Sequence, residues 1–240
     1  MYKTRCPKCA ERGKDRSGDN LGIYSDGHAY CFSCGYSSNG TINNKLNKTI
    51  RQDKAIPDLP EDISNTLGEN AKRWLLRYFP AKEDFPKCLW SEQEQKLYFM
   101  LEGGAYQYRY FGTQPKHPKW VGYGINENLL HISSNSRMDC NHHVLVLVED
   151  IISGMKVGHI LPTLTLFGSN ISLKRLAAIK LLGYNEVIIW LDWDKKEYAI
   201  KAAQSAQSIG LLARVIHTIL DPKEYDNARI LQILELGSTS

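Results

Sequence analysis

The sequence lacks any apolar run near the roughly 20 residues that a membrane span requires. Its first residues, MYKTRCPKCA, lack the apolar core of a signal peptide. The phosphate-loop pattern GxxxxGK[ST] is also missing, so the sequence contains no motor of the P-loop class. The lack of a long apolar run and of a signal-peptide core argues against membrane and exported proteins. We therefore expect a cytoplasmic protein with no membrane partner.

Cysteine is sparse, at six residues in 240. In a cytoplasmic setting, so few cysteines favour thiols and metal ligation over disulfides. The hydrophobic fraction of 42% is ordinary, and the length allows one large domain or two small ones. Net charge is +4, and residues 1–60 carry ten Lys/Arg against six Asp/Glu. The excess suggests an anionic partner such as nucleic acid, although a solvated basic face would look the same.

Four of the cysteines form two Cys-x-x-Cys pairs, CPKC and CFSC, separated by 21 residues. Paired spacing of this kind is typical of a tetrahedral structural Zn²⁺ site, with unrelated or redox-active cysteines as the alternative. The predicted ligands are Cys6, Cys9, Cys31 and Cys34. Cys88 and Cys140 have no partner at such a spacing.

The segment between the pairs predicts a hairpin, with strands at 21–24 and 28–32 joined by the turn at 25–27. A small sheet held by one metal would be a zinc ribbon. Tyr24 and His28 combine aromatic faces with hydrogen-bonding tips, so they are candidates for contacting unpaired bases. The alternative is that the aromatic side chains only form the core of the ribbon.

The C-terminal part predicts an α/β fold with a parallel sheet. Continuous apolar runs at Val144–Val148 and Val187–Leu191 read as strands buried on both faces. Strand-like and helical stretches alternate around them. The further strands are expected at 163–167 and 211–216, and the helices at 151–157, 172–182 and 195–209.

Acidic residues follow the predicted strands. Glu149 and Asp150 follow the first apolar run, Asp192 and Asp194 follow the second, and Asp221 follows the last strand. In open parallel sheets, ligands bind beyond the carboxyl ends of the strands. Crowded carboxylates at that edge predict a hard divalent cation, Mg²⁺ or Mn²⁺. For any one of them, a solvated turn residue is the alternative.

The middle of the chain is less distinctive. Residues 41–60 are polar and read as a flexible linker, or as a segment packed along the core. A helix is expected within 61–80, with an acidic start at Glu61 and Asp62, and a hairpin at 97–101 and 105–111. The stiff loop that follows contains Lys116 and Lys119, which could hold phosphate or could be solvated turn residues. Arg109 and Arg137 are further candidates for nucleic-acid contact.

Two stretches carry a family resemblance. GDNLGIYSDGHAYCFSCGY resembles the zinc-binding module of phage primases of the kind fused to a hexameric helicase. The segment from Val144 to Asp226 resembles the Toprim domain of DnaG-type primases, in which one strand ends in Glu and a later strand ends in D-x-D. The resemblance implies a ribbon at 1–40, a linker at 41–60, the first part of a primase core at 61–140 and a Toprim domain at 141–240.

The resemblance also implies an activity, which is the synthesis of short RNA primers from ribonucleoside triphosphates on single-stranded DNA. Glu149, Asp192 and Asp194 would be catalytic metal ligands, Asp221 a further ligand, and Glu149 also a candidate general base. Lys116 and Lys119 match basic residues that precede Toprim. A separate replicative helicase is the expected partner, in the host cytoplasm if the protein is phage-encoded.

The sequence departs from the family pattern at two positions. Asp150 replaces a glycine, and Ser153 stands where an Asp is common. Two other functions fit parts of the pattern, a RecR-like recombination mediator and a Toprim nuclease. The SDGHAYC hairpin and the long segment before Val144 favour the primase over both.

Overall fold

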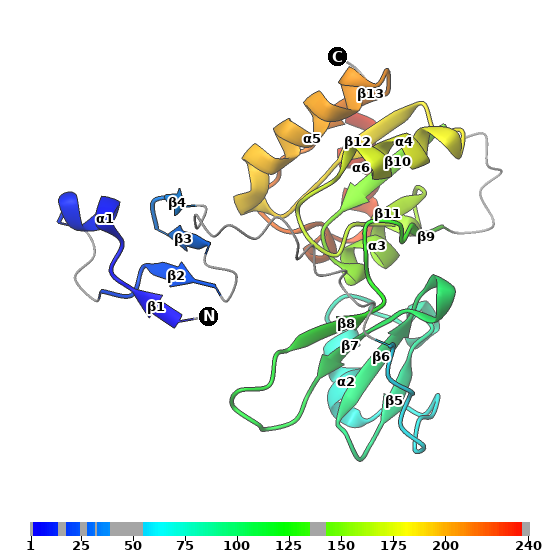
Figure 1. The fold of residues 1–240 in the computed structure, drawn as a ribbon. Helices are drawn as coiled ribbons and strands as arrows, with labels where there is room; N and C mark the ends of the chain where they lie inside the picture. Colours follow the sequence, from blue (N-terminus) through cyan, green and yellow to red (C-terminus); the bar gives the residue numbers. More distant parts are fainter. Residues whose placement is uncertain are drawn as a thin grey trace. The chain divides into compact units, whose positions relative to one another are not determined.

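The computed structural model describes residues 2–13, 18–24, 28–31, 33–38, 55–134 and 143–236. The chain forms two compact units, Met1–Gln52 and Asp53–Ser240, shown in Figure 1. Within the described ranges, no helix is long and apolar enough to cross a membrane. The predicted turn at 25–27, Phe32, Arg137, Cys140 and linker residues 41–54 lie outside the described residues.

The N-terminal unit is a small antiparallel sheet in the order β1-β2-β3-β4. Its elements are β1 (Tyr2–Thr4), α1 (Pro7–Glu11), β2 (Leu21–Ile23), β3 (Ala29–Cys31) and β4 (Ser37–Ser38). The predicted hairpin is confirmed, because Leu21 pairs with Cys31 and Ile23 with Ala29. Its buried core is three cysteines with Leu21 and Ala29. So small a core needs another source of stability, which a metal can supply.

The second unit begins with an antiparallel sheet in the order β5-β6-β7-β8. The strands are β5 (Leu89–Ser91), β6 (Lys96–Met100), β7 (Tyr106–Tyr110) and β8 (Trp120–Tyr123), with helix α2 (Glu69–Leu75). Alternation along β6 and β7 divides the side chains between two faces. Leu97 and Phe99 pack with Trp74 and Leu75 of α2, whereas three tyrosines, Tyr98, Tyr106 and Tyr108, form the other cluster.

The segment before this sheet differs from the prediction. The helix begins at Glu69 and not at the acidic pair Glu61 and Asp62. Asp62 instead accepts hydrogen bonds from Ser91 Oγ at 2.7 Å and from the backbone N–H of Gln93 at 2.9 Å. An acidic residue can satisfy turn amides as well as a helix start, so the composition alone did not distinguish the two.

Residues 57–60, which the sequence placed in the linker, contact the tyrosine face of the sheet. The Tyr106 hydroxyl donates to the carbonyl of Pro57 at 3.2 Å. Leu59 packs against the tyrosine cluster. The chain is therefore held against the second unit before residue 61.

The parallel sheet is confirmed. Its order is β13-β12-β10-β11-β9, with β10 (Val144–Val148) between β11 (Thr163–Thr165) and β12 (Glu186–Ile189). β13 (Leu212–Val215) continues it in parallel. The edge strand β9 (His131–Ser133) runs antiparallel and was not predicted.

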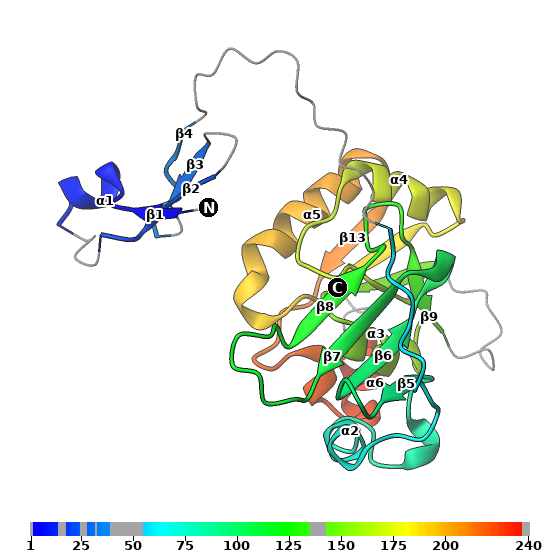
Figure 2. The ribbon, with the colours of Figure 1, turned by 60° about the horizontal axis from the view of Figure 1, so that its bottom comes forward.

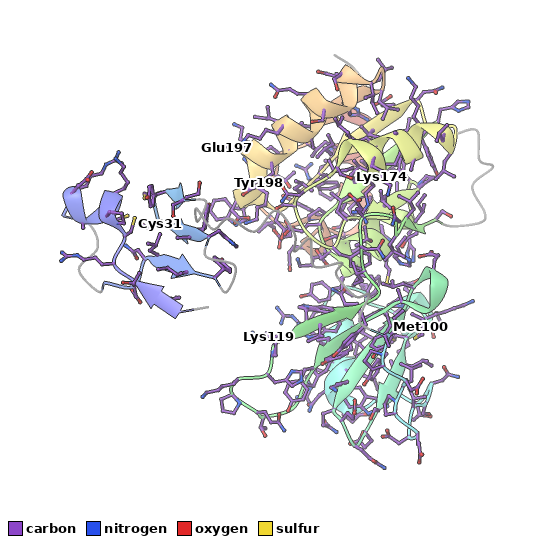
Figure 3. All side chains as sticks on the ribbon, in the orientation of Figure 1. Cys31, Met100, Lys119, Lys174, Glu197 and Tyr198 are labelled. Carbon is purple, nitrogen blue, oxygen red and sulfur yellow. The ribbon has the colours of Figure 1, made fainter. Side chains whose placement is uncertain are left out.

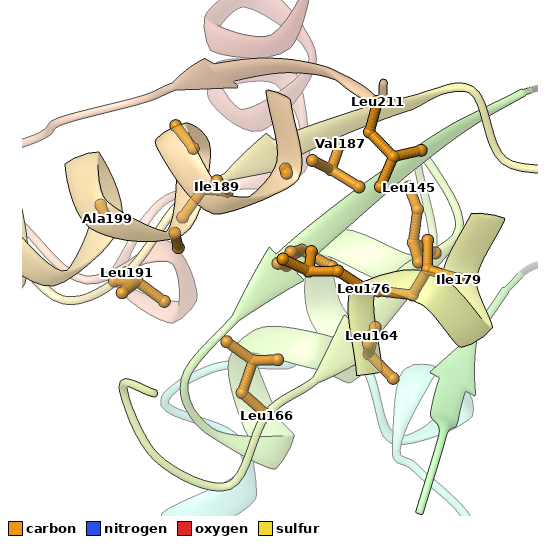
Figure 4. Packing of buried hydrophobic residues seen from close by; sticks show 14 residues of the cluster. Leu145, Leu164, Leu166, Leu176, Ile179, Val187, Ile189, Leu191, Ala199 and Leu211 are labelled. Carbon is orange, nitrogen blue, oxygen red and sulfur yellow. The ribbon is translucent and has the colours of Figure 1, made fainter. Parts of the chain in front are cut away.

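Helices cover both faces of this sheet (Figure 1), and Figure 4 shows the packing on one of the two faces. On one face, Leu145 and Leu147 of β10 pack with α4 (Leu173–Leu181) and α5 (Lys196–Ser208). On the other face, Val146 and Val148 pack with α3 (Ile151–Gly158) and α6 (Asn227–Leu236). Consecutive residues of β10 point to opposite faces of the sheet, and helices cover both faces. Every residue of this strand is therefore apolar.

Candidate functional site

The four predicted zinc ligands come together in the N-terminal unit. The Sγ atoms of Cys6, Cys9, Cys31 and Cys34 all lie within 4.8 Å of one another. Cys6 Sγ is 3.7 Å from Cys34 Sγ, and Cys9 Sγ is 3.6 Å from Cys31 Sγ. These distances are too long for disulfides, which measure about 2.05 Å. Tetrahedral Zn–S bonds of about 2.3 Å place neighbouring sulfurs about 3.8 Å apart, so the cluster fits zinc.

The thiols differ in how readily they ionise. Burial raises the pKa of Cys9 to about 12. Burial also raises the pKa of Cys31, but the backbone N–H groups of Cys34 and Ser33, with neighbouring thiols, outweigh it and lower the pKa to about 7. The surroundings therefore favour the thiolate at Cys31, whereas burial disfavours it at Cys9 unless a cation offsets the charge.

Tyr24 and His28, the predicted base-contacting residues, lie together at the end of the hairpin. Their rings stack with centroids 4.1 Å apart and planes 9° apart. The backbone N–H of Tyr24 donates to the carbonyl of His28 at 3.0 Å. Both side chains are half-buried, so each keeps exposed surface.

In the second unit, Glu149 and Asp192 follow adjacent strands of the parallel sheet. Leu147 is in register with Ile189, and the Trp190 N–H donates to the Leu147 carbonyl at 2.9 Å. The sheet therefore brings the two carboxylates to the same edge, as predicted. Glu149 Oε2 and Asp192 Oδ1 are buried and have no hydrogen-bond partner among the described residues.

Both carboxylates resist ionisation. Burial raises the pKa of Asp192 to about 7; Asp221, Asp150 and Glu149 add to the rise, and Lys223 opposes it. Burial likewise raises the pKa of Glu149. Buried, unpartnered carboxylate oxygens cost free energy unless a cation compensates them. The pair therefore has the donor chemistry that a hard divalent cation requires.

Asp194 and Asp221 lie at this edge in different surroundings. The strand expected at 187–191 ends at Ile189 as β12, and Asp194 lies beyond it in the 3-10 turn η3 (Trp193–Lys195). Asp194 is exposed and pairs with Lys195 Nζ at 2.7 Å, which lowers its pKa. Asp221 precedes η4 (Pro222–Glu224). In the described parts of the chain, only the cysteines place three or more candidate ligand atoms within 4.8 Å.

Asp150, the residue that departs from the family pattern, caps helix α3. Its Oδ1 accepts from the backbone N–H groups of Ile152 at 3.0 Å and Ser153 at 3.2 Å, and its Oδ2 accepts from Ser153 Oγ at 2.6 Å. The Asp150 and Ser153 departures are therefore linked, since one side chain binds the other. Lys223, which the sequence reasoning missed, pairs with Asp150 and Asp221. Burial lowers the pKa of Lys223, but the two carboxylates raise it by more than burial lowers it. The pKa of Lys223 is therefore higher than that of an exposed lysine.

Lys116 and Lys119 are exposed in the loop between β7 and β8. The loop is anchored where the His117 ring packs on Tyr110, with centroids 4.1 Å apart. In Figures 1 and 2 this loop and the start of α5 lie on the same side of the second unit. Figure 3 labels Lys119 and, at the start of α5, Glu197. The basic loop therefore faces the same side as the turn that follows Asp192.

Arg109 has a packing role in the structure. Its guanidinium lies over Trp74 at 4.4 Å, Phe111 at 5.2 Å and Trp120 at 5.5 Å from the ring centroids. Burial lowers its pKa. A planar cation among aromatic faces stabilises this packing. Nucleic-acid contact by Arg109 stays a prediction.

No protein-family model and no curated protein matches the chain. Several solved structures are similar to it, and two of them are primases. One contains the zinc-binding and RNA polymerase domains of the Aquifex aeolicus primase, with a TM-score of 0.48, 12% identity and coverage of 73% of this chain and 49% of that chain. The other is the primase fragment of the bacteriophage T7 primase-helicase protein, with a TM-score of 0.44, 16% identity and coverage of 100% and 99%. This chain thus spans about half of the Aquifex chain.

Proposed function

We propose that this protein is a DNA-dependent RNA primase, which binds single-stranded DNA and joins ribonucleoside triphosphates into short RNA on that template. The observation that carries the proposal is the pair of buried, unpartnered carboxylate oxygens on Glu149 and Asp192 at the edge of the parallel sheet. Acceptors placed in this way suit a divalent cation that binds a triphosphate. The four-cysteine ribbon in the same chain supports a template-binding role.

The acidic residues bind the catalytic metal ion in this proposal. Glu149 and Asp192 hold Mg²⁺ or Mn²⁺, whose charge would stabilise the triphosphate and the leaving pyrophosphate. Glu149, whose pKa is raised by burial, would also accept the proton of the attacking 3′-hydroxyl. Asp194 and Asp221 stay predictions as further ligands, because lysines already pair with them.

The basic loop and the ribbon supply the contacts to nucleic acid in the proposal. Lys116 and Lys119 hold phosphate groups on the side of the acidic edge, which is the edge of the parallel sheet that carries Glu149, Asp150, Asp192 and Asp221. Tyr24 and His28 offer aromatic faces on which unpaired template bases can stack. A separate helicase that presents the single strand stays a prediction.

Primer synthesis tests the proposal. Zinc-loaded protein is incubated with labelled ribonucleotides, Mg²⁺ and a pool of single-stranded templates, beside Asp192→Ala and the control Glu197→Gln. Glu197 is exposed near the edge and has no task in the proposal. We expect short RNA from the wild type and from Glu197→Gln, and none from Asp192→Ala. DNA binding without any product, on every template and with added helicase, would favour the recombination mediator. Degraded templates would favour the nuclease.

A further inference from the structure

The ammonium group of Lys223 lies between two carboxylates of the acidic edge. Its Nζ is 3.1 Å from Asp150 Oδ2 and 2.9 Å from Asp221 Oδ2. The side chain is 19% exposed. Asp150 follows β10 and Asp221 follows β13, so one lysine joins residues that are distant in sequence. This is a bridging position of the kind that a metal ion commonly takes among carboxylates.

The surrounding structure fixes Lys223 in this position. Lys156 of α3, only 7% exposed, donates from Nζ to the backbone carbonyl of Lys223 at 3.0 Å. Pro222, which immediately precedes Lys223, is buried, and its ring fixes its own φ angle. At the other end, the cap contacts with α3 hold Asp150. Because backbone and partner are both held, little freedom remains to be lost when the ion pairs form.

The carboxylates of the edge therefore fall into two groups. Asp150 and Asp221 already have a cation, which the protein supplies. Glu149 Oε2 and Asp192 Oδ1 have no hydrogen-bond partner among the described residues. Lys223 also acts on Asp192 through its charge. The edge thus has one cation position that is filled by a side chain and one that is open to an external ion.

We propose that Lys223 takes one of two cation positions at this edge, so that the protein binds one divalent cation, at Glu149 and Asp192, and not two. The inference rests on the proposed function for its catalytic meaning. An ammonium between Asp150 and Asp221 occupies the oxygens that a second ion would need and repels that ion. The positive charge of Lys223 also offsets part of the negative charge of the carboxylates, which weakens their attraction for a second ion.

Binding of Mn²⁺ tests this arrangement. The full-length, zinc-loaded protein is titrated with Mn²⁺ without nucleotide, and free Mn²⁺ is followed by electron paramagnetic resonance. We expect one edge ion in the wild type, lost in Asp192→Asn. Lys223→Met should bind a second edge ion, whereas Lys223→Arg should bind one, as the wild type does. The double variant Asp150→Asn/Lys223→Met restores the charge balance while Asn still caps α3, so it should return toward wild-type binding.

The inference is overturned if Lys223→Met still binds a single edge ion, or if the wild type already binds two edge ions. Lys223→Gln serves as a second neutral variant should the methionine not fold, and the same two results decide. The readout needs neither template nor nucleotide. A wild type that binds one ion but makes no RNA would overturn the proposed function and leave this inference standing.

Discussion

Substituting Asp192 by Asn should stabilise the metal-free protein above neutral pH. Asn keeps the size of the side chain and removes the charge that burial opposes. Burial and the neighbouring carboxylates raise the pKa of Asp192 to about 7, against about 3.9 in an unfolded chain. Between these pH values the folded state binds more protons than the unfolded state. The free energy of unfolding therefore falls as the pH rises from about 4 to about 7.

The size of the effect follows from the difference between the pKa of Asp192 in the folded protein, about 7, and its value of about 3.9 in the unfolded chain. At about 1.4 kcal/mol per unit, the ionised Asp192 costs the folded state about 4 kcal/mol above pH 7. Below pH 4 both states are protonated, and this cost vanishes. The stability of Asp192→Asn relative to the wild type should therefore increase by about 4 kcal/mol between pH 4 and pH 8.

Urea unfolding followed by tryptophan fluorescence measures this directly, because all five tryptophans lie in the second unit. The two proteins are compared at several pH values in buffer freed of divalent cations. Mg²⁺ added at pH 8 to 100 times its Kd should raise the wild-type free energy of unfolding by about 2.7 kcal/mol. It should leave Asp192→Asn unchanged. If the stability difference between the two proteins does not vary between pH 4 and pH 8, Asp192 is not a buried carboxylate with a raised pKa.

Three further outcomes are expected. Cys31→Ser should lower the zinc content below one ion per chain and weaken DNA binding, which metal analysis and a binding titration would check; full zinc content would contradict the four-thiol site. Lys116→Ala/Lys119→Ala should reduce the salt slope of DNA binding by about 2, whereas Lys174→Ala, an exposed control, should not; equal slopes would remove the loop from the interface. Arg109→Ala should lower the free energy of unfolding by roughly 1–2 kcal/mol through lost aromatic packing. No loss in urea unfolding would contradict that packing role.

Patterned segments of the fold could be predicted from the sequence. Val144–Val148 is a strand with the expected bounds, because both faces of a central parallel strand demand apolar residues. The hairpin expected between the cysteine pairs is present in the ribbon as β2 and β3, although both strands are shorter than expected. β9 was missed because three residues at a sheet edge carry no periodicity. The helix start at Glu69 was missed because Gly68 at the N-cap gives no side-chain signal.

The candidate site was predictable where chain order determined it. Parallel strands bring their ends to one edge, so Glu149 and Asp192 could be placed together without a structure. Lys223 could not, because its pairing with Asp150 depends on how η4 packs beside α3. The packing of Arg109 on Trp74 likewise could not be predicted, because the two residues are 35 positions apart in the sequence. Contacts between side chains far apart in the sequence leave no periodic trace in it.

The most direct test of the central claim is whether the RNA product follows the template. Single-stranded templates that differ at one base are incubated with zinc-loaded protein, Mg²⁺ and all four ribonucleotides, and the products are sequenced. We expect short RNA whose sequence changes at the complementary position and which disappears with Asp192→Asn. A product unaffected by the template change, or no product from the wild type on any template, would contradict it.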